Sequence, residues 1–166
     1  RHLAGRPVEV LLELPRLEDP QIRKAIKLLM TLWAPAFILG ESALSDLAGA
    51  RMVRLSLEYG NCEESAYGYV AFAMTIGWRL GDYARAHEYG RLGIALNERL
   101  ADLRLRCKVH HRFAALVNPW RKPFATCFPH AKEAVRAGLE CGDFMIAAYG
   151  QFQQSWWGMQ VEPDLG

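Results

Sequence analysis

Two adjacent pairs of ionisable residues, His110-His111 and Glu63-Glu64, are the first groups in this sequence that could do chemistry. Neighbouring positions of a helix point about 100° apart, so the two histidines cannot bind one metal ion as positions i and i+4 can. The two glutamates stand where a helix is expected to begin, and the helix dipole favours negative charge there. We therefore interpret the histidines as surface or interface residues and the glutamates as part of a helix start.

The four cysteines, Cys62, Cys107, Cys127 and Cys141, show no Cys-x-x-Cys spacing and no ligand-like pairing with histidine. We expect reduced thiols that pack as small core residues of an intracellular protein. No glycine-rich loop follows a strand as a phosphate-binding loop would. Because no nucleophile-base set or metal set emerges, we expect this fragment to have no enzymatic activity and no cofactor.

Composition and charge restrict the class of protein. A chain of 166 residues suits one domain, and 51 % hydrophobic with 23 % charged residues is typical of a protein that folds. A net charge of +2 is too balanced for a nucleic-acid partner, and we interpret the residues Arg104 to Arg112 as a solvated basic helix face. No apolar run reaches the roughly 18 residues that span a bilayer. We expect a soluble, cytoplasmic protein without membrane insertion, cut from a longer polypeptide because it lacks an initiator methionine and a signal peptide.

Helical patterns dominate the chain. Sustained strand alternation and Asn-Gly or Asp-Gly hairpin turns are missing, whereas Ala, Leu, Glu and Arg are frequent. Apolar residues recur at three-and-four spacing, with breaks expected at Pro35, at Gly40 and at several Gly-Asp-like pairs. The predicted helices span Pro20 to Trp33, Glu41 to Tyr59, Glu64 to Leu80, Tyr83 to Leu100, Leu103 to Val117, Trp120 to Cys141 and Phe144 to Gln160.

A repeat of about 41 residues organises these helices. Residues 57–61, Leu-Glu-Tyr-Gly-Asn, reappear as residues 139–143, Leu-Glu-Cys-Gly-Asp, at a displacement of 82 residues, with Ala101-Asp102 halfway between them. Gly in such a pair can end one helix in the left-handed conformation, and Asn or Asp can cap the next helix. A fixed period in this range is typical of stacked helical hairpins.

One stretch of the chain resembles a known helical repeat. Residues 79–86, Arg-Leu-Gly-Asp-Tyr-Ala-Arg-Ala, and residues 93–96, Gly-Ile-Ala-Leu, resemble a tetratricopeptide repeat, whose turn reads Gly-Asp-Tyr followed by small residues. The resemblance implies an all-α, right-handed α-solenoid of about three and a half helical hairpins, with residues 1–166 as a single domain. The sequence departs from that family in its period, 41 rather than 34 residues, and in lacking the usual proline at the repeat end.

A second resemblance covers most of the chain. Residues 17–22, 34–37, 52–61 and 117–121 look like the helical region of large bacterial signalling proteins. In that family a Ser/Thr-kinase-like domain and an ATPase precede the helical region, and GAF and sensor histidine kinase domains follow it. The resemblance implies a helical-repeat linker in a bacterial sensor kinase. The kinase, ATPase and GAF motifs themselves are absent from this sequence.

The tetratricopeptide resemblance also implies a binding surface, because the first helix of each hairpin lines a concave groove in that family. This assigns residues 64–80, 103–117 and 144–160 to the groove. Trp and Arg are enriched at protein-binding hot spots, which suits a groove for a protein or peptide partner. The candidate residues are Thr75, Trp78, Arg79, Arg112, Trp120, Gln153, Trp157 and Gln160, with Arg121 beside them.

The turn Asn118-Pro119-Trp120-Arg121 has its own local interpretation. Asn is expected to cap the following helix and Pro to occupy its first position. Trp120 and Arg121 form either a contact site or a packed corner, and we favour the packed corner.

Two functional hypotheses follow for this chain. The leading one is a protein interaction and signal-relay scaffold, since stacked repeats contact only their neighbours and can deform like a spring. The alternative is a small-molecule sensor with an enclosed groove lined by Tyr67, Tyr69 and the tryptophans. The expected partner is a protein or peptide, or neighbouring domains of the same polypeptide.

The last predicted helix should lack its hairpin partner, because residues 162–166 stand where the next turn is due. We expect Phe152, Trp156 and Met159 to expose apolar surface there. A second copy of the chain, forming a homodimer through the C-terminal end, or missing sequence would cover that surface.

Overall fold

The structure, a computed structural model, describes the backbone of residues 8–161 and the side chains of residues 8–160. Helices joined by short turns make up the described residues, and the only strand-like pairing among residues 8–161 is one isolated bridge between Arg16 and Asn61. This confirms the all-α prediction. The elements are η1 (Val8–Glu13), α1 (Pro20–Ile38), α2 (Ser42–Tyr59), α3 (Glu63–Leu80), α4 (Tyr83–Leu100), α5 (Leu103–Arg112), η2 (Phe113–Val117), η3 (Asn118–Trp120), η4 (Phe124–Thr126), α6 (Phe128–Cys141) and α7 (Phe144–Val161).

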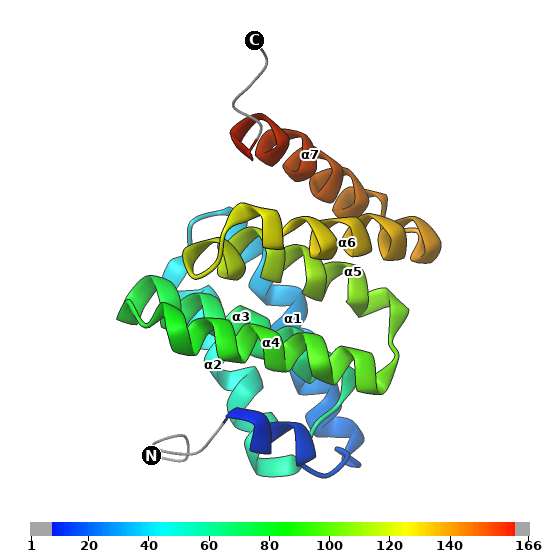
Figure 1. Ribbon diagram of the computed structural model, residues 1–166. Helices are drawn as coiled ribbons and strands as arrows, with labels where there is room; N and C mark the ends of the chain where they lie inside the picture. Colours follow the sequence, from blue (N-terminus) through cyan, green and yellow to red (C-terminus); the bar gives the residue numbers. More distant parts are fainter. Residues whose placement is uncertain (1–7, 162–166) are drawn as a thin grey trace.

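Successive helices pack against one another, with α3 at the centre. Helix α3 contacts α1, α2, α4 and α5, while α6 lies between α5 and α7. Figure 1 shows α4 alongside α3, the α5 and α6 pair beyond them, and α7 at the far end. The core between α1 and α4 contains the fully buried rings of Tyr67, Tyr69 and Tyr89. None of the helices in residues 8–161 is long and apolar enough to cross a membrane.

Three of the predicted turns have the expected local chemistry. Gly81 and Gly142 adopt left-handed conformations with φ of 69° and 79°, and Ala101 in the halfway position does the same at 53°. The aspartate that follows each of them accepts a hydrogen bond from a backbone N–H of the next helix's first turn. Left-handed geometry is disfavoured for an L-residue such as alanine, so the turn rather than the residue sets this conformation.

The turn before α3 differs from the prediction. Asn61 does not cap α3, because its side chain is buried and bonded elsewhere: Nδ2 donates to the Leu11 carbonyl and Oδ1 accepts from the Tyr69 hydroxyl. The capping role falls to Cys62 and Ser65, whose side chains and backbone groups form a reciprocal capping box. Asn61 therefore connects η1 to the core through its side-chain hydrogen bonds. This role depends on residues distant in the sequence, so the local pattern could not predict it.

Two predicted helix boundaries are wrong, and proline is involved in both. Helix α1 does not break at Pro35 but continues to Ile38. Proline removes one N–H donor from the ladder, and the backbone N–H groups of Leu39 and Glu41 still donate to the carbonyls of Pro35 and Ala36. The sixth helix begins at Phe128 instead of Trp120. Pro123 disfavours the helical conformation of Lys122 before it, so two short 3-10 turns replace the expected first turns.

Candidate interaction site

A recess forms where the C-terminal part of α1, the start of α2 and the C-terminal part of α3 meet. Its volume is about 220 Å³. Three of the nine predicted groove residues, Thr75, Trp78 and Arg79, line it. We call it the α1–α3 recess, and its lining comprises Trp33, Phe37, Gly40, Ser42, Ser45, Asp46, Ala71, Met74, Thr75, Trp78 and Arg79.

Aromatic rings form the apolar wall of this recess. Trp33 stacks on Phe37 with centroids 5.0 Å apart and planes within 8°, and Phe37 lies 5.7 Å from Trp78. Trp33 is buried, whereas Trp78 is 44 % exposed. Trp78 therefore presents an accessible apolar face beside a fixed aromatic pair, which is typical of an interface anchor.

A polar rim faces the aromatic wall, and Asp46 of α2 organises it. The Thr75 hydroxyl donates to Asp46 Oδ1 at 2.8 Å, and Arg79 Nε donates to Oδ2 at 2.7 Å. These bonds fix two side chains of α3 against α2. The partner groove predicted from the sequence did not include Trp33, Phe37 and Asp46, because it was assigned only to the first helices of three hairpins.

Arg112 occupies a buried position between two aromatic rings, so it does not belong to a solvated basic face. Its guanidinium carbon lies 4.6 Å from the Tyr67 ring centroid and 5.2 Å from that of Trp33, and the residue is only 9 % exposed. Its Nη1 donates to the Lys108 carbonyl, while Nε has no hydrogen-bond partner among the described atoms. Burial raises the pKa of the Tyr67 hydroxyl to about 12, with Arg112 opposing that shift. Arg112 thus joins α1, α3 and α5 through cation–π contacts.

Trp120 and Arg121 lie away from the α1–α3 recess. Trp120 stacks on Tyr83 at the start of α4, with centroids 5.8 Å apart and planes 16° apart, and remains 57 % exposed. Asn118 does not cap a helix with its side chain; it is buried and binds His87 and Thr126 instead. The turn is therefore a packed corner whose indole is partly accessible.

The three candidates on α7 have different environments. Trp157 is buried against Phe124 and Phe128, with ring centroids 6.0 Å away in both cases. Gln153 is half-buried, and Gln160 is exposed. Accordingly, the nine candidates do not share one surface: Thr75, Trp78 and Arg79 are together, and the other six lie elsewhere.

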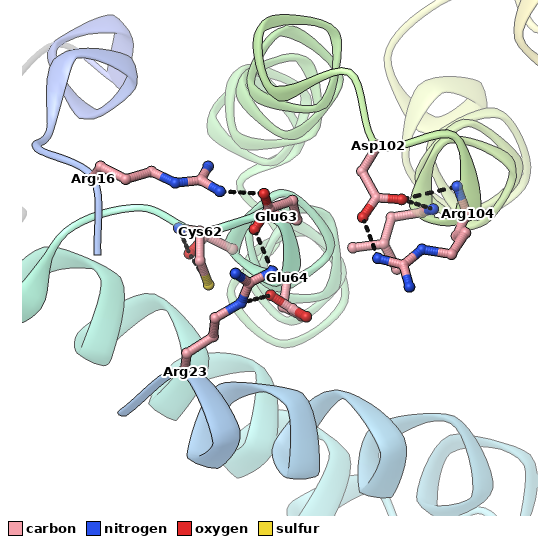
Figure 2. Close-up of polar contacts among 9 residues, drawn as sticks. Arg16, Arg23, Cys62, Glu63, Glu64, Asp102 and Arg104 are labelled. Atoms are coloured by element: carbon pink, nitrogen blue, oxygen red, sulfur yellow. Dashed lines mark hydrogen bonds and ion pairs between the residues drawn. The ribbon is translucent and has the colours of Figure 1, made fainter. Parts of the chain in front are cut away.

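The acidic pair at the start of α3 is engaged in ion pairs (Figure 2). Glu63 binds Arg16 and Arg23, the latter at 2.6 Å, and Arg23 Nε lies 3.4 Å from Glu64 Oε2. Burial alone would raise the pKa of Glu63, but the hydrogen bond and charge of Arg16, with help from Arg23, leave it lowered. An ionised, paired carboxylate suits a structural role and not a general acid.

The histidines are distributed over separate contacts. His110 Nδ1 lies 3.2 Å from His130 Nδ1, whereas His111 stacks on Tyr149 of α7. His110 is buried, so a surface position is the wrong interpretation for it. Burial lowers the pKa of both His110 and His111 to about 4, so both rings are neutral at neutral pH.

The Sγ atoms of Cys107 and Cys141 lie 3.9 Å apart without a disulfide bond between them. No group of three or more His, Cys, Asp or Glu side chains in the described part of the chain is arranged to hold a metal ion. The cysteines are free thiols, three of them buried and Cys141 half-buried.

Comparison of the chain with models of protein families, with characterised proteins and with solved structures found no match. What this protein does must therefore be inferred from its own residues.

Proposed function

We propose that this chain is a non-catalytic interaction and signal-relay domain in which the α1–α3 recess accepts a side chain of a protein partner. Trp33 is both a wall of the recess and one of the two rings that enclose Arg112. A group that enters the recess therefore contacts a residue belonging to the joint between α1, α3 and α5.

The size and polarity of the recess favour a partner's side chain over a whole small molecule. Pockets for small molecules usually measure about 300–1,000 Å³, and this recess has about 220 Å³. Its wall is aromatic, and its polar rim is already satisfied by the bonds from Thr75 and Arg79 to Asp46. An apolar anchor residue of a peptide would fill it without leaving a buried polar group unpaired.

The relay part of the proposal rests on a series of ring contacts across the helices. Arg112 lies between Trp33 and Tyr67, and the adjacent His111 stacks on Tyr149 of α7 with centroids 5.8 Å apart. A shift of α1 at the recess would therefore act on α5 and, through it, on α7. Coupling of this kind requires packed elements that have two arrangements.

We place these helices in a right-handed, tetratricopeptide-like solenoid with a period of about 41 residues. Helices α1, α3, α5 and α7 contact one another in that order, as the first helices of successive hairpins would. The resemblance of residues 79–86 to the tetratricopeptide turn is the sequence support. In this proposal the domain belongs to a cytoplasmic bacterial sensor kinase and relays partner binding to neighbouring domains.

The outer face of α7 supports a further contact in the same proposal. Phe152, Trp156 and Met159 are exposed by 64 %, 52 % and 61 %, as expected from the sequence. Exposed large apolar side chains that gather on one helix are typical of an interface. A second copy of the chain or a neighbouring domain would cover it. Residues 162–166, where the next turn was expected, lie outside the described residues.

A small-molecule sensor is the second candidate, but its site would differ from the one expected. Tyr67 and Tyr69 are buried in the core, at 1 % and 0 % exposure, and do not line the α1–α3 recess. Two other recesses, of about 550 and 490 Å³, lie along α4 and are within the size range of small-molecule sites. The two tyrosines do not line these recesses either.

Selection of peptides from a random phage-displayed library on the immobilised chain tests the leading proposal. Selected peptides should share a large apolar residue and lose about ten-fold or more in affinity for a Trp78→Ala variant, the range of an interface anchor. Trp120→Ala is the matched control, because it removes an exposed indole outside the recess. Peptides that bind the Trp78→Ala variant and the unmodified chain equally would exclude the recess as the site.

A further inference from the structure

The outer side of α4 carries a cleft made of two adjoining recesses, which we call the α4 cleft. Both recesses are lined by His87, Arg91, Ala95 and Lys122. The first extends to η1 and Arg121 and has a volume of about 550 Å³. The second, of about 490 Å³, extends to Phe113, Asn118, Thr126 and His130. In Figure 1, α4 is the green helix that runs along α3.

Three cations of this cleft have no acidic partner among the described residues. Within residues 8–160, no carboxylate oxygen lies within ion-pair distance of Arg91, Arg121 or Lys122. All three charges act on His87: burial lowers its pKa, the hydrogen bond with Asn118 opposes that shift, and Lys122, Arg91 and Arg121 lower the pKa further. A concave surface with converging, unpaired cations attracts an anion.

The segment that carries two of these cations is held in place by Asn118. The Asn118 carbonyl accepts hydrogen bonds from the backbone N–H groups of Arg121 and Lys122, at 3.0 and 2.9 Å. Trp120 stacks on Tyr83 of α4, which fixes the same segment from the other side. The backbone positions of the two cations are therefore set before any ligand arrives, and a preformed site loses less entropy on binding.

A chain of hydrogen bonds also defines the protonation of His87. Thr126 Oγ1 donates to the Pro123 carbonyl, so it accepts from Asn118 Nδ2, and Asn118 Oδ1 is left to accept from His87. Neutral His87 therefore carries its proton on Nε2, and Nδ1 is the atom that gains a proton when the ring becomes charged. A charged imidazole would add a further donor to the cleft.

We propose that the α4 cleft binds a small molecule that bears a phosphate group. Arg91 and Lys122, which line both recesses, and Arg121 would contact the phosphate oxygens. The accessible apolar side chains of Leu12, Ala84 and Ala95 would contact the organic part. Glu9, Glu88 and Glu98 also line the recesses, and their charges oppose a long polyanion that runs past the three cations. The site is separate from the α1–α3 recess and does not depend on the proposed partner.

Pyrophosphate is a suitable probe, with inorganic phosphate and acetate compared at constant ionic strength. We expect pyrophosphate to shift the His87 ring signals saturably in long-range ¹H–¹⁵N spectra and to raise the His87 pKa, because added negative charge offsets the three cations. Arg91→Gln and Lys122→Gln should each weaken binding by about ten-fold, the usual effect of losing one charge-assisted contact.

Arg51→Gln provides the control, since Arg51 is an exposed arginine of α2 without an ion pair among the described residues. Its affinity for pyrophosphate should equal that of the unmodified chain. Equal weakening in all three variants would overturn the proposal, because it would indicate general charge attraction. Acetate binding as tightly as pyrophosphate, or tight binding of an oligonucleotide that pyrophosphate cannot displace, would also overturn it. Circular dichroism establishes that each variant is folded.

Discussion

Replacing Gly93 with alanine should push α4 away from α3 and lower the stability of the fold, because the two helices approach each other closely at this glycine. A Cβ atom on Gly93 would lie 2.5 Å from Val70 Cγ2 and 2.6 Å from the Ala66 carbonyl oxygen. The valine methyl could rotate away, but the carbonyl belongs to the backbone of α3. The added methyl group therefore requires the helices to move apart, with loss of contacts on both sides of the new atom.

The expected loss of stability follows from two opposing contributions. Overpacking of a core usually costs about 1–3 kcal/mol, and contact with an immovable backbone atom favours the upper part of that range. The higher helix propensity of alanine returns at most about 1 kcal/mol. The net loss of about 2 kcal/mol should lower the Tm by roughly 4–8 °C for a chain of this length.

Gly158→Ala is the matched control for this prediction. Gly158 lies in α7, and a Cβ atom added to it would meet no neighbouring atom within 4 Å, so alanine should raise the stability by up to about 1 kcal/mol. Urea titration followed by circular dichroism measures both changes in the free energy of unfolding. If Gly93→Ala were as stable as Gly158→Ala, the close packing of α3 against α4 would be refuted.

Three further predictions concern buried groups. Arg112→Ala should lower the free energy of unfolding by about 2–4 kcal/mol, because two desolvated cation–π contacts are lost. A change below about 0.5 kcal/mol in urea titrations would contradict the role of Arg112 in holding α1, α3 and α5 together. His110 and His111 have pKa values of about 4 when folded, chiefly through burial, and about 6.5 when unfolded. The unfolded chain thus binds more protons between these values, so stability is complete above pH 6.5 and falls toward pH 4, by at most about 3 kcal/mol per ring. A free energy of unfolding that is equal at pH 7 and pH 5 would contradict this. Iodoacetamide at pH 8 should alkylate half-buried Cys141 before Cys107, because burial and the neighbouring Cys141 raise the pKa of the Cys107 thiol to about 12. Mass spectrometry of timed samples gives the order of alkylation. Alkylation of Cys107 first would contradict the packing of α5 against α6.

The sequence predicts much of the local structure because turns are encoded by neighbouring residues. Gly81 with Asp82 and Gly142 with Asp143 form the expected left-handed helix ends and caps. Ala101 adopts the same conformation at the halfway position. Local rules fail where a side chain has a distant partner. Asparagine is a preferred residue at helix N-caps, yet the side chains of Asn61 and Asn118 bind Leu11 and His87, which are far away in the sequence.

The candidate site was predictable only in part. Thr75, Trp78 and Arg79 share one helix face at three-and-four spacing, so a sequence pattern can group them. Asp46, which holds two of them, lies on another helix, and no local pattern connects it to α3. Trp157 shows the converse case, since a tryptophan at a suitable spacing is buried against Phe124 and Phe128 instead of lining a groove.

The most direct test of the proposed function is the effect of filling the α1–α3 recess. Ala71 lines it, and Ala71→Leu would place a larger side chain at that wall. We expect a recess-binding peptide selected on the unmodified chain to lose at least ten-fold in affinity for this variant, measured by fluorescence anisotropy, while its affinity for the Trp120→Ala control is unchanged. Undiminished binding to a folded Ala71→Leu variant would show that the partner does not bind in this recess.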